Sequence, residues 1–224
     1  MDIQVWSDVV CPWCYIGRRR LEKALAEFQG RVTVTYRAYQ LDPLPAPQVR
    51  PEGWSSVRQP VPIKRAMAAK FGGPARAEQM FRHVTAVAAG DGLTLDFDRA
   101  IAADTFDAHR LIVWATAQRR QAEMVDALQR AHFTEGVDVG SRVALAGVAG
   151  SIGLDRAAAL DYLESEAGTN AVRADLMEAR ELGITSVPTF VIDGKYAVHG
   201  AQEPAMLVSA LAEIARRESV DARR

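Results

Sequence analysis

Two cysteines lie close together near the start of the chain, in the sequence Cys11-Pro12-Trp13-Cys14. They are the only 2 cysteines among the 224 residues, so neither has another partner for a disulfide within the chain. A thiol pair at this spacing can alternate between dithiol and disulfide, which is the chemistry of thiol–disulfide exchange. We therefore expect Cys11 and Cys14 to form a redox pair.

The segments on either side of the pair predict how it is held. Residues 3–6 are rich in strand formers, and from Tyr15 onward apolar residues recur at helical spacing. Pro12 suits the first turn of a helix, where its missing N–H has no cost. Unpaired backbone N–H groups at the helix start favour a thiolate at Cys11. Cys11 is thus the expected nucleophile, and Cys14 the resolving cysteine.

Two other interpretations of the cysteine pair are weaker. A structural zinc site needs two more ligands, and the histidines stand singly and far apart in the sequence, at His83, His109, His132 and His199. Two inert buried cysteines would also fit the spacing, but the proline between them is typical of a helix start. We predict redox chemistry and no metal site.

Composition limits the other classes of function. The chain is 49% apolar and 25% charged, enough for a sizeable core in one domain, or in one domain with an insertion. A net charge of -1 gives no reason to expect nucleic acid or an anionic membrane surface. No apolar stretch approaches the ~20 residues that span a bilayer. Because no signal-like segment precedes the first strand, we expect a cytoplasmic protein, in which an isolated CxxC is more often catalytic than structural.

The rest of the chain divides into two strand-containing ends and a helical middle. Residues 31–39 alternate as a strand and complete a βαβ unit, and residues 41–62 form a proline-rich connector. Strands are expected at 187–192 and 195–198, joined by a two-residue turn at Asp193-Gly194, before a last helix from Pro204 to about Arg217. The helices predicted between these ends span 63–71, 74–89, 97–119, 121–133, 141–151, 156–163 and 169–182.

This order of elements predicts an α/β protein with a thioredoxin fold, βαβ…ββα, that carries a large all-helical insertion. We expect residues 1–62 to hold the N-terminal half and the connector, and residues 63–168 to hold the insertion. Residues 169–224 would then hold the C-terminal half of the fold, αββα.

The chain resembles the FrnE-like branch of the DsbA family of thioredoxin-fold oxidoreductases, which is related to kappa-class glutathione transferases and 2-hydroxychromene-2-carboxylate isomerases. The resemblance covers essentially the whole chain. It departs from the usual family pattern at Asp104, usually Asn, and at Ser186, usually Gly. The match is carried by DVVCPWCYIG at 8–17, TFDAHRL at 105–111, AHFTEG at 131–136, LGITSVPTFVID at 182–193 and HGAQ at 199–202.

The resemblance implies a cis peptide bond between Val187 and Pro188. Pro188 would then lie against the disulfide and complete the substrate site, leaving the backbone of Val187 free to pair with an extended substrate. An ordinary proline that opens an edge strand is the alternative.

Several other side chains are candidates for the site. Trp6, Trp13, Tyr15 and Trp54 could line an apolar substrate groove, and of these we expect only Trp13, next to Pro12, to be exposed, with Trp6 in the core. Asp8 could take part in proton transfer to Cys14, or could be a solvated surface residue. His109 and Arg110 could face the groove and hold an anionic substrate or glutathione, but a helix start with polar surface residues is the favoured alternative.

We therefore expect a thiol–disulfide oxidoreductase that acts on protein or small thiols, as a monomer or a homodimer. No cofactor is expected, with glutathione possible as a co-substrate. Pro12-Trp13 has no ionisable group, so we expect a redox potential between those of strong oxidants and strong reductants. One alternative is a glutathione-dependent transferase or isomerase of the kappa or hydroxychromene type, although these normally have a serine where Cys11 stands. Another is a redox-inactive biosynthetic accessory protein.

Overall fold

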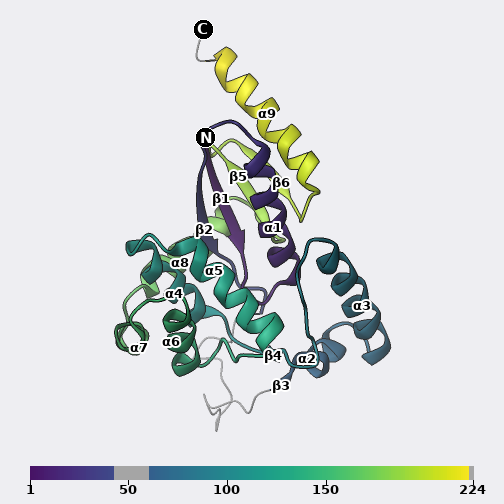
Figure 1. Cartoon of the computed structure of the whole chain (residues 1–224), viewed down its shortest axis with the longest axis vertical. Coiled ribbons are helices and arrows are strands. Elements are labelled where there is room, and N and C mark those ends of the chain that lie inside the picture. Colours follow the sequence, from purple (N-terminus) through teal and green to yellow (C-terminus); the bar gives the residue numbers. More distant parts are fainter. Residues whose placement is uncertain (43–60, 222–224) are drawn as a thin grey trace.

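A four-stranded mixed sheet forms the centre of the protein, in the order β2-β1-β5-β6 (Figure 1). The computed structural model describes residues 1–42 and 61–221. Strand β1 (Asp2–Ser7) runs parallel to β2 (Thr33–Ala38) and antiparallel to β5 (Thr189–Ile192), and β5 pairs with the antiparallel β6 (Tyr196–His199). The two ends of the chain thus build one sheet, which confirms the predicted thioredoxin fold.

Alternation along the strands assigns each face of the sheet to different helices. Ile3 and Val5 on β1 share a core with apolar residues of α1 (Pro12–Glu27) and α9 (Pro204–Asp221). Trp6 and Val191 share a smaller cluster with Ala179 of α8 (Thr169–Glu181). Because side chains alternate along a strand, both faces of the sheet can be buried by these three helices. Trp6 is fully buried, as predicted.

The helical middle of the chain lies at one end of the sheet (Figure 1). Helices α2 and α3 pack on each other beside the start of α1, and the others form a second group against β2 and α8. The bounds are α2 Ile63–Lys70, α3 Pro74–Gly90, α4 Phe106–Ala117, α5 Gln121–Arg130, α6 Arg142–Ser151 and α7 Arg156–Glu164.

The helix predicted over 97–119 is wrong in its first part, because α4 begins only at Phe106. The Asp96 carboxylate accepts the backbone N–H groups of Asp98 and Arg99, which holds a single turn there. The chain then extends into β4 (Ile101–Ala102), which pairs with β3 (Val61–Pro62) in a separate two-stranded sheet. This long-range pairing overrides the local helical pattern, so the insertion contains one short strand.

Three smaller predictions also need correction. The last hairpin has a three-residue loop, because Ile192 pairs with Tyr196, although Asp193 and Gly194 have the positive φ expected of the turn. Helix α9 continues to Asp221 rather than ending near Arg217. The helix predicted over 121–133 is α at first but ends in a π-helix, Ala131–Glu135.

Some sequence predictions are not tested by the structure. Trp54 and most of the proline-rich connector lie outside the described residues. The predicted division of the chain at residues 62 and 168 stays a prediction. Within residues 1–42 and 61–221, no helix is both long enough and apolar enough to cross a membrane.

Gly17 on α1 allows the loop before β5 to approach the helix closely. A Cβ atom at Gly17 would lie 2.7 Å from Cγ of Pro188 and 3.5 Å from the ring of Phe190. The first distance is shorter than any normal carbon–carbon contact, and a proline ring has little freedom to move away. Gly17 therefore sets how close α1 and the Val187–Pro188 loop can lie.

The contact predicts opposite effects for two helical glycines. Gly17→Ala should lower the free energy of unfolding by about 1–3 kcal/mol, because overpacking against Pro188 outweighs the gain in helix propensity. Gly147→Ala in α6 is the matched control. A Cβ atom at Gly147 would have no neighbour within 4 Å, so this change should raise the free energy of unfolding by up to about 1 kcal/mol. Urea unfolding followed by circular dichroism measures both, and equal stabilisation by the two changes would contradict the close contact.

Candidate active site

The loop between β1 and α1 places Cys11 at the start of a helix. The N–H of Cys11 donates to the carbonyl of Asp8 at 3.2 Å, and the carbonyl of Cys11 accepts the N–H groups of Cys14 and Tyr15 at 3.1 and 3.2 Å. Cys11 is the N-cap residue of α1 and Pro12 is the first helical residue. The expected position of Cys11 at the positive end of α1 is confirmed.

The two thiols differ in their surroundings. The side chain of Cys11 lines a cavity, whereas Cys14 is 1% exposed and lies behind it. Burial raises the pKa of Cys14 well above its usual range, and its hydrogen bond to Cys11 and the charge of Cys11 raise it further. Cys14 is therefore held as a thiol, and Cys11 is the one of the two that borders the cavity.

The loop before β5 reaches Cys11 from the other end of the chain. The thiol of Cys11 points at the carbonyl oxygen of Val187, with 3.9 Å between Sγ and O. The bond between Val187 and Pro188 is cis, as the family resemblance implied. Val187, Cys11, Pro12 and Trp13 all line the same cavity, so most of the predicted site residues are brought together.

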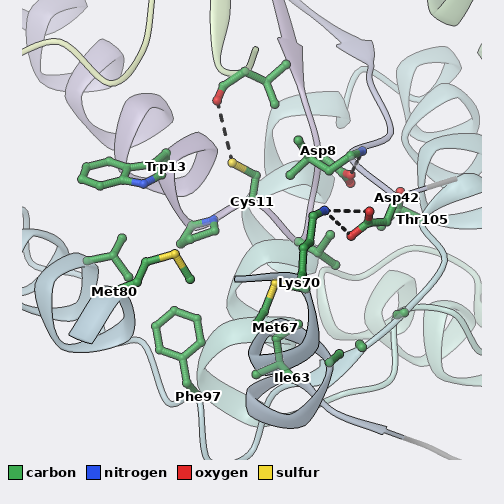
Figure 2. Close-up of a pocket in the computed structure, with 18 of the residues that line it drawn as sticks. Asp8, Cys11, Trp13, Asp42, Ile63, Met67, Lys70, Met80, Phe97 and Thr105 are labelled. Atoms are coloured by element: carbon green, nitrogen blue, oxygen red, sulfur yellow. Dashed lines mark hydrogen bonds and ion pairs between the residues drawn. The ribbon is translucent and has the colours of Figure 1, made fainter. Parts of the chain in front are cut away.

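The cavity beside Cys11 has a volume of about 640 Å³ and mainly apolar walls. Figure 2 shows Cys11 at one edge of it, with Trp13 next to the sulfur and Ile63, Met67, Met80 and Phe97 on the opposite side. These opposing residues come from α2, α3 and the segment before β4, so the helical insertion builds the wall that faces the redox pair. The volume is in the range of sites for small molecules.

Polar groups lie on one side of this cavity. Lys70 of α2 forms an ion pair with Asp42, with 2.7 Å between Nζ and Oδ1, which Figure 2 draws as dashed lines. Asp104 and Thr105 also line the cavity, and the Asp104 carboxylate accepts the N–H of Phe106 at the start of α4. Asp104, where the family that the sequence resembles usually has Asn, thus accepts a hydrogen bond at the start of α4 and also lines the cavity.

Asp8 is a buried carboxylate rather than a surface residue. Its side chain is 1% exposed, and Oδ2 accepts the N–H of Leu41 at 2.9 Å. Oδ1 lies 3.5 Å from Nε2 of His109. The charge of Asp8 also contributes to the raised pKa of Cys14. The burial of Asp8 excludes the surface alternative, and its proton transfer to Cys14 stays a prediction.

His109 and Arg110 are buried, so neither the predicted groove role nor the surface role describes them. His109 is not among the residues that line the cavity, and its Nε2 lies 3.0 Å from the carbonyl of Tyr39. The Arg110 guanidinium binds the end of α7 and the residues after it, together with Asp107. Its carbonyl acceptors are those of Tyr162, Leu163, Ser165 and Ala167. His109 thus joins α4 to the segment after β2, whereas Arg110 joins α4 to the end of α7 within the insertion. Local sequence could not reveal either contact.

His132 was not selected from the sequence, although it belongs to the AHFTEG segment that carries the resemblance. Its side chain is fully buried, and burial lowers its pKa to about 4 while the charge of Asp8 acts in the opposite direction. Neither ring nitrogen has a hydrogen-bond partner in the described part of the chain. An unsatisfied buried polar group costs about 1–3 kcal/mol, so its presence calls for an explanation.

No group of three or more His, Cys, Asp or Glu side chains that could hold a metal ion occurs among residues 1–42 and 61–221.

Comparison with known proteins agrees with this geometry. A family model described as a DSBA-like thioredoxin domain matches residues 2–212. The chain belongs to this DSBA-like family. The probable DsbA oxidoreductase SCO1869 of Streptomyces coelicolor is 34% identical and has a TM-score of 0.82, over 95% of this chain and 89% of that one. The resemblance to the DsbA family is therefore confirmed, while the FrnE-like branch stays a prediction.

Two more distant structures share the fold alone. A 2-hydroxychromene-2-carboxylate isomerase is 19% identical, with a TM-score of 0.68 over 98% of both chains. The cytosolic disulfide reductase DsbM of Pseudomonas aeruginosa is 22% identical, with a TM-score of 0.64 over 96% of this chain and 99% of that one. DsbM has also been solved with GSH.

The lowered pKa of His132 predicts a loss of stability in acid. The unfolded chain binds a proton at His132 below its ordinary pKa of 6.5, but the folded protein does so only below about 4. The free energy of unfolding is therefore unaffected by this group above pH 6.5. It falls by about 3 kcal/mol in all as the pH drops from 6.5 towards 4, because only the unfolded chain binds the proton in this range. Urea unfolding at pH 7 and pH 4.5 should show a smaller loss for His132→Gln than for the wild type. The same change at the exposed His83 is the control, and an equal loss in all three proteins would contradict the assignment.

Proposed function

We propose that this protein is a thiol–disulfide oxidoreductase in which Cys11 is the nucleophile and Cys14 resolves the mixed disulfide. The observation that carries the proposal is the asymmetry of the pair. Cys11 stands at the helix N-terminus and opens to the cavity, whereas Cys14 is sealed behind it as a thiol. This is the arrangement that thiol–disulfide exchange requires, because one sulfur must meet the substrate while the other waits for the mixed disulfide.

In the reducing direction, the Cys11 thiolate attacks a substrate disulfide and releases one substrate thiolate. Cys14 then loses its proton, attacks Cys11 and releases the second substrate thiolate, which leaves the Cys11–Cys14 disulfide. In the oxidising direction the same steps run backwards, with a substrate thiolate attacking Cys11 of the disulfide. We assign Asp8, which is buried near Cys14, as the group that accepts the Cys14 proton.

Pro188 and Val187 complete the substrate site in this proposal. The carbonyl of Val187 already faces the sulfur of Cys11, and Pro188 packs on α1 at Gly17. A substrate that extends along this loop would pair with the backbone of Val187 while its sulfur meets Cys11. Trp13 and Pro12 would then contact the part of the substrate next to the disulfide.

The substrate class that this proposal covers is thiols and disulfides, of proteins or small molecules. DsbM, which shares the fold, is a disulfide reductase and has been solved with GSH, so glutathione is proposed as a co-substrate. We propose the cytoplasm as the location and a redox potential between those of strong oxidants and strong reductants, since Pro12-Trp13 has no ionisable group.

The apolar cavity favours a second candidate function. A volume of about 640 Å³ beside Cys11 could hold an aromatic substrate of a glutathione-dependent isomerase or transferase. Such an enzyme would need one reactive residue rather than two. Replacing Cys14 therefore distinguishes the two functions, because an isomerase would keep its activity without Cys14 and a disulfide oxidoreductase would not.

Serine substitutions of the two cysteines test the proposal. Cys14→Ser should accumulate a mixed disulfide at Cys11 when the reduced protein meets a small aromatic disulfide, because nothing resolves it. Cys11→Ser should form no adduct, and the wild type should reach the internal disulfide. Intact-protein mass spectrometry distinguishes the three products. Rapid adduct formation by Cys11→Ser would overturn the assignment of the nucleophile.

A further inference from the structure

Arg20 binds two other parts of the molecule that border the active site. It is a buried residue of α1 and lies about two turns from Pro12. Its Nε donates to Oδ2 of Asp91 at 2.6 Å, and Nη1 donates to the carbonyl of Ala201 at 2.7 Å. Nη2 lies 2.8 Å from the carboxylate of Glu203. One guanidinium thus joins α1 to the end of α3 and to the segment between β6 and α9.

The segment after β6 also holds the cis-proline loop. The N–H of Gly200 donates to the carbonyl of Pro188 at 2.8 Å, and the next residue is Ala201. Gly17, which meets the ring of Pro188, lies three residues before Arg20 and therefore on the same face of α1. This face of the redox helix contacts the cis-proline loop directly at Gly17, and Arg20 reaches the same loop through Ala201 and Gly200.

Asp91 stands where its charge does not help its own helix. It is the C-cap residue of α3, and a carboxylate is unfavourable at this negative end of a helix. Its side chain is buried, and Lys23 of α1 donates to Oδ1 at 2.7 Å while Arg20 binds Oδ2. Burial acts to raise the pKa of Asp91, but the hydrogen bonds from Lys23 and Arg20 outweigh it and lower the pKa overall. The carboxylate therefore stays charged and attaches α3 to α1.

This attachment bears on the cavity wall that faces Cys11. Helix α3 supplies Met80, Phe81 and Val84 to the cavity, and Met80 is drawn in Figure 2. Val84 lies seven residues before Asp91, so the cavity wall and the ion pair share one face of α3. Because α3 packs mainly on α2 and α1, its distance from Cys11 depends on what ties it to α1.

We propose that Arg20 is a positioning residue that holds α3 and the cis-proline loop in place beside Cys11, and that the cavity so formed selects disulfides with a large apolar group, such as an aromatic ring. Arg20 does not itself line the cavity, so it acts through the elements that it binds. A wall of methionine and aromatic side chains suits an apolar group, whereas a disulfide with short polar arms gains little from it. This role rests on the proposed disulfide exchange, to which it adds a residue and a substrate class.

Two disulfide probes distinguish this role from a general structural one. Reduced protein would be mixed with dithiodipyridine, which is aromatic, or with hydroxyethyl disulfide, which is small and polar. With either probe the Cys11 thiolate attacks one sulfur and one thiolate leaves, so acid quenching and mass spectrometry give the rate of attack. Each rate is divided by that of N-acetylcysteine with the same probe, because the two leaving groups differ in reactivity. In the wild type this relative rate should be about tenfold or more higher for dithiodipyridine, since its ring is buried in the cavity.

Replacing Arg20 should abolish the preference without abolishing the reaction. Arg20→Met should lower the relative rate with dithiodipyridine about tenfold, because a small displacement of the wall no longer holds the ring beside Cys11. Its rate with hydroxyethyl disulfide should equal that of the wild type. Arg19→Met is the matched control, since the side chain of Arg19 is 43% exposed and pairs with Glu22 of its own helix. It should change neither rate.

A second variant covers the case in which Arg20→Met does not fold. The double variant, Arg20→Met with Asp91→Leu, replaces the buried ion pair by apolar residues, a change that is often neutral for stability. It should fold, as judged by circular dichroism and urea unfolding, and show the same selective loss.

Equal slowing with both probes, or failure of both variants to fold, would make Arg20 structural and overturn the inference. Unchanged rates in a folded Arg20 variant would also overturn it, as would a wild type without preference for the aromatic probe. A wild type that forms neither a mixed nor an internal disulfide with either probe would instead contradict the proposed function itself.

Discussion

The contact between the start of α1 and the cis-proline loop is the constraint on which the site depends. Cys11 and Val187 are 176 residues apart in the chain, yet the thiol of one faces the carbonyl of the other. The sheet brings them together, because β1 and β5 are direct neighbours and their ends carry the two loops. Gly17 then allows Pro188 to close on the helix. A larger residue at position 17 would push Pro188 away from the helix and so change the space beside Cys11.

The same arrangement makes two chemically identical thiols unequal. Cys11 lies at the helix N-terminus and borders the cavity, while burial and the neighbouring Cys11 raise the pKa of Cys14. The helical insertion adds to this difference, because its α2 and α3 form the far wall of the cavity in front of Cys11.

Short sequence patterns correctly predicted the elements that are determined by residues close together in the chain. The CPWC sequence at a strand-to-helix junction located the redox pair, and alternation in residues 31–39 located β2. Signals that depend on distant contacts were missed. Residues 97–100 have a helical pattern in the sequence, but the residues that follow them pair with β3 as strand β4. Arg110 has the character of a surface residue in the sequence, but in the fold it binds the end of α7. His132 was missed for the same reason, since only the fold buries its ring away from any hydrogen-bond partner among the described residues.

The central claim is that Cys11 and Cys14 form one reversible two-electron couple, and redox equilibrium tests it most directly. The pure protein would be equilibrated against glutathione buffers of varied ratio, quenched, and its free thiols counted by mass. The account predicts that both thiols appear and disappear together, with a midpoint between about -270 and about -120 mV, the values typical of strong reductants and strong oxidants in this fold. A protein that stops at a stable glutathione adduct on Cys11, or whose thiols titrate separately, would contradict it.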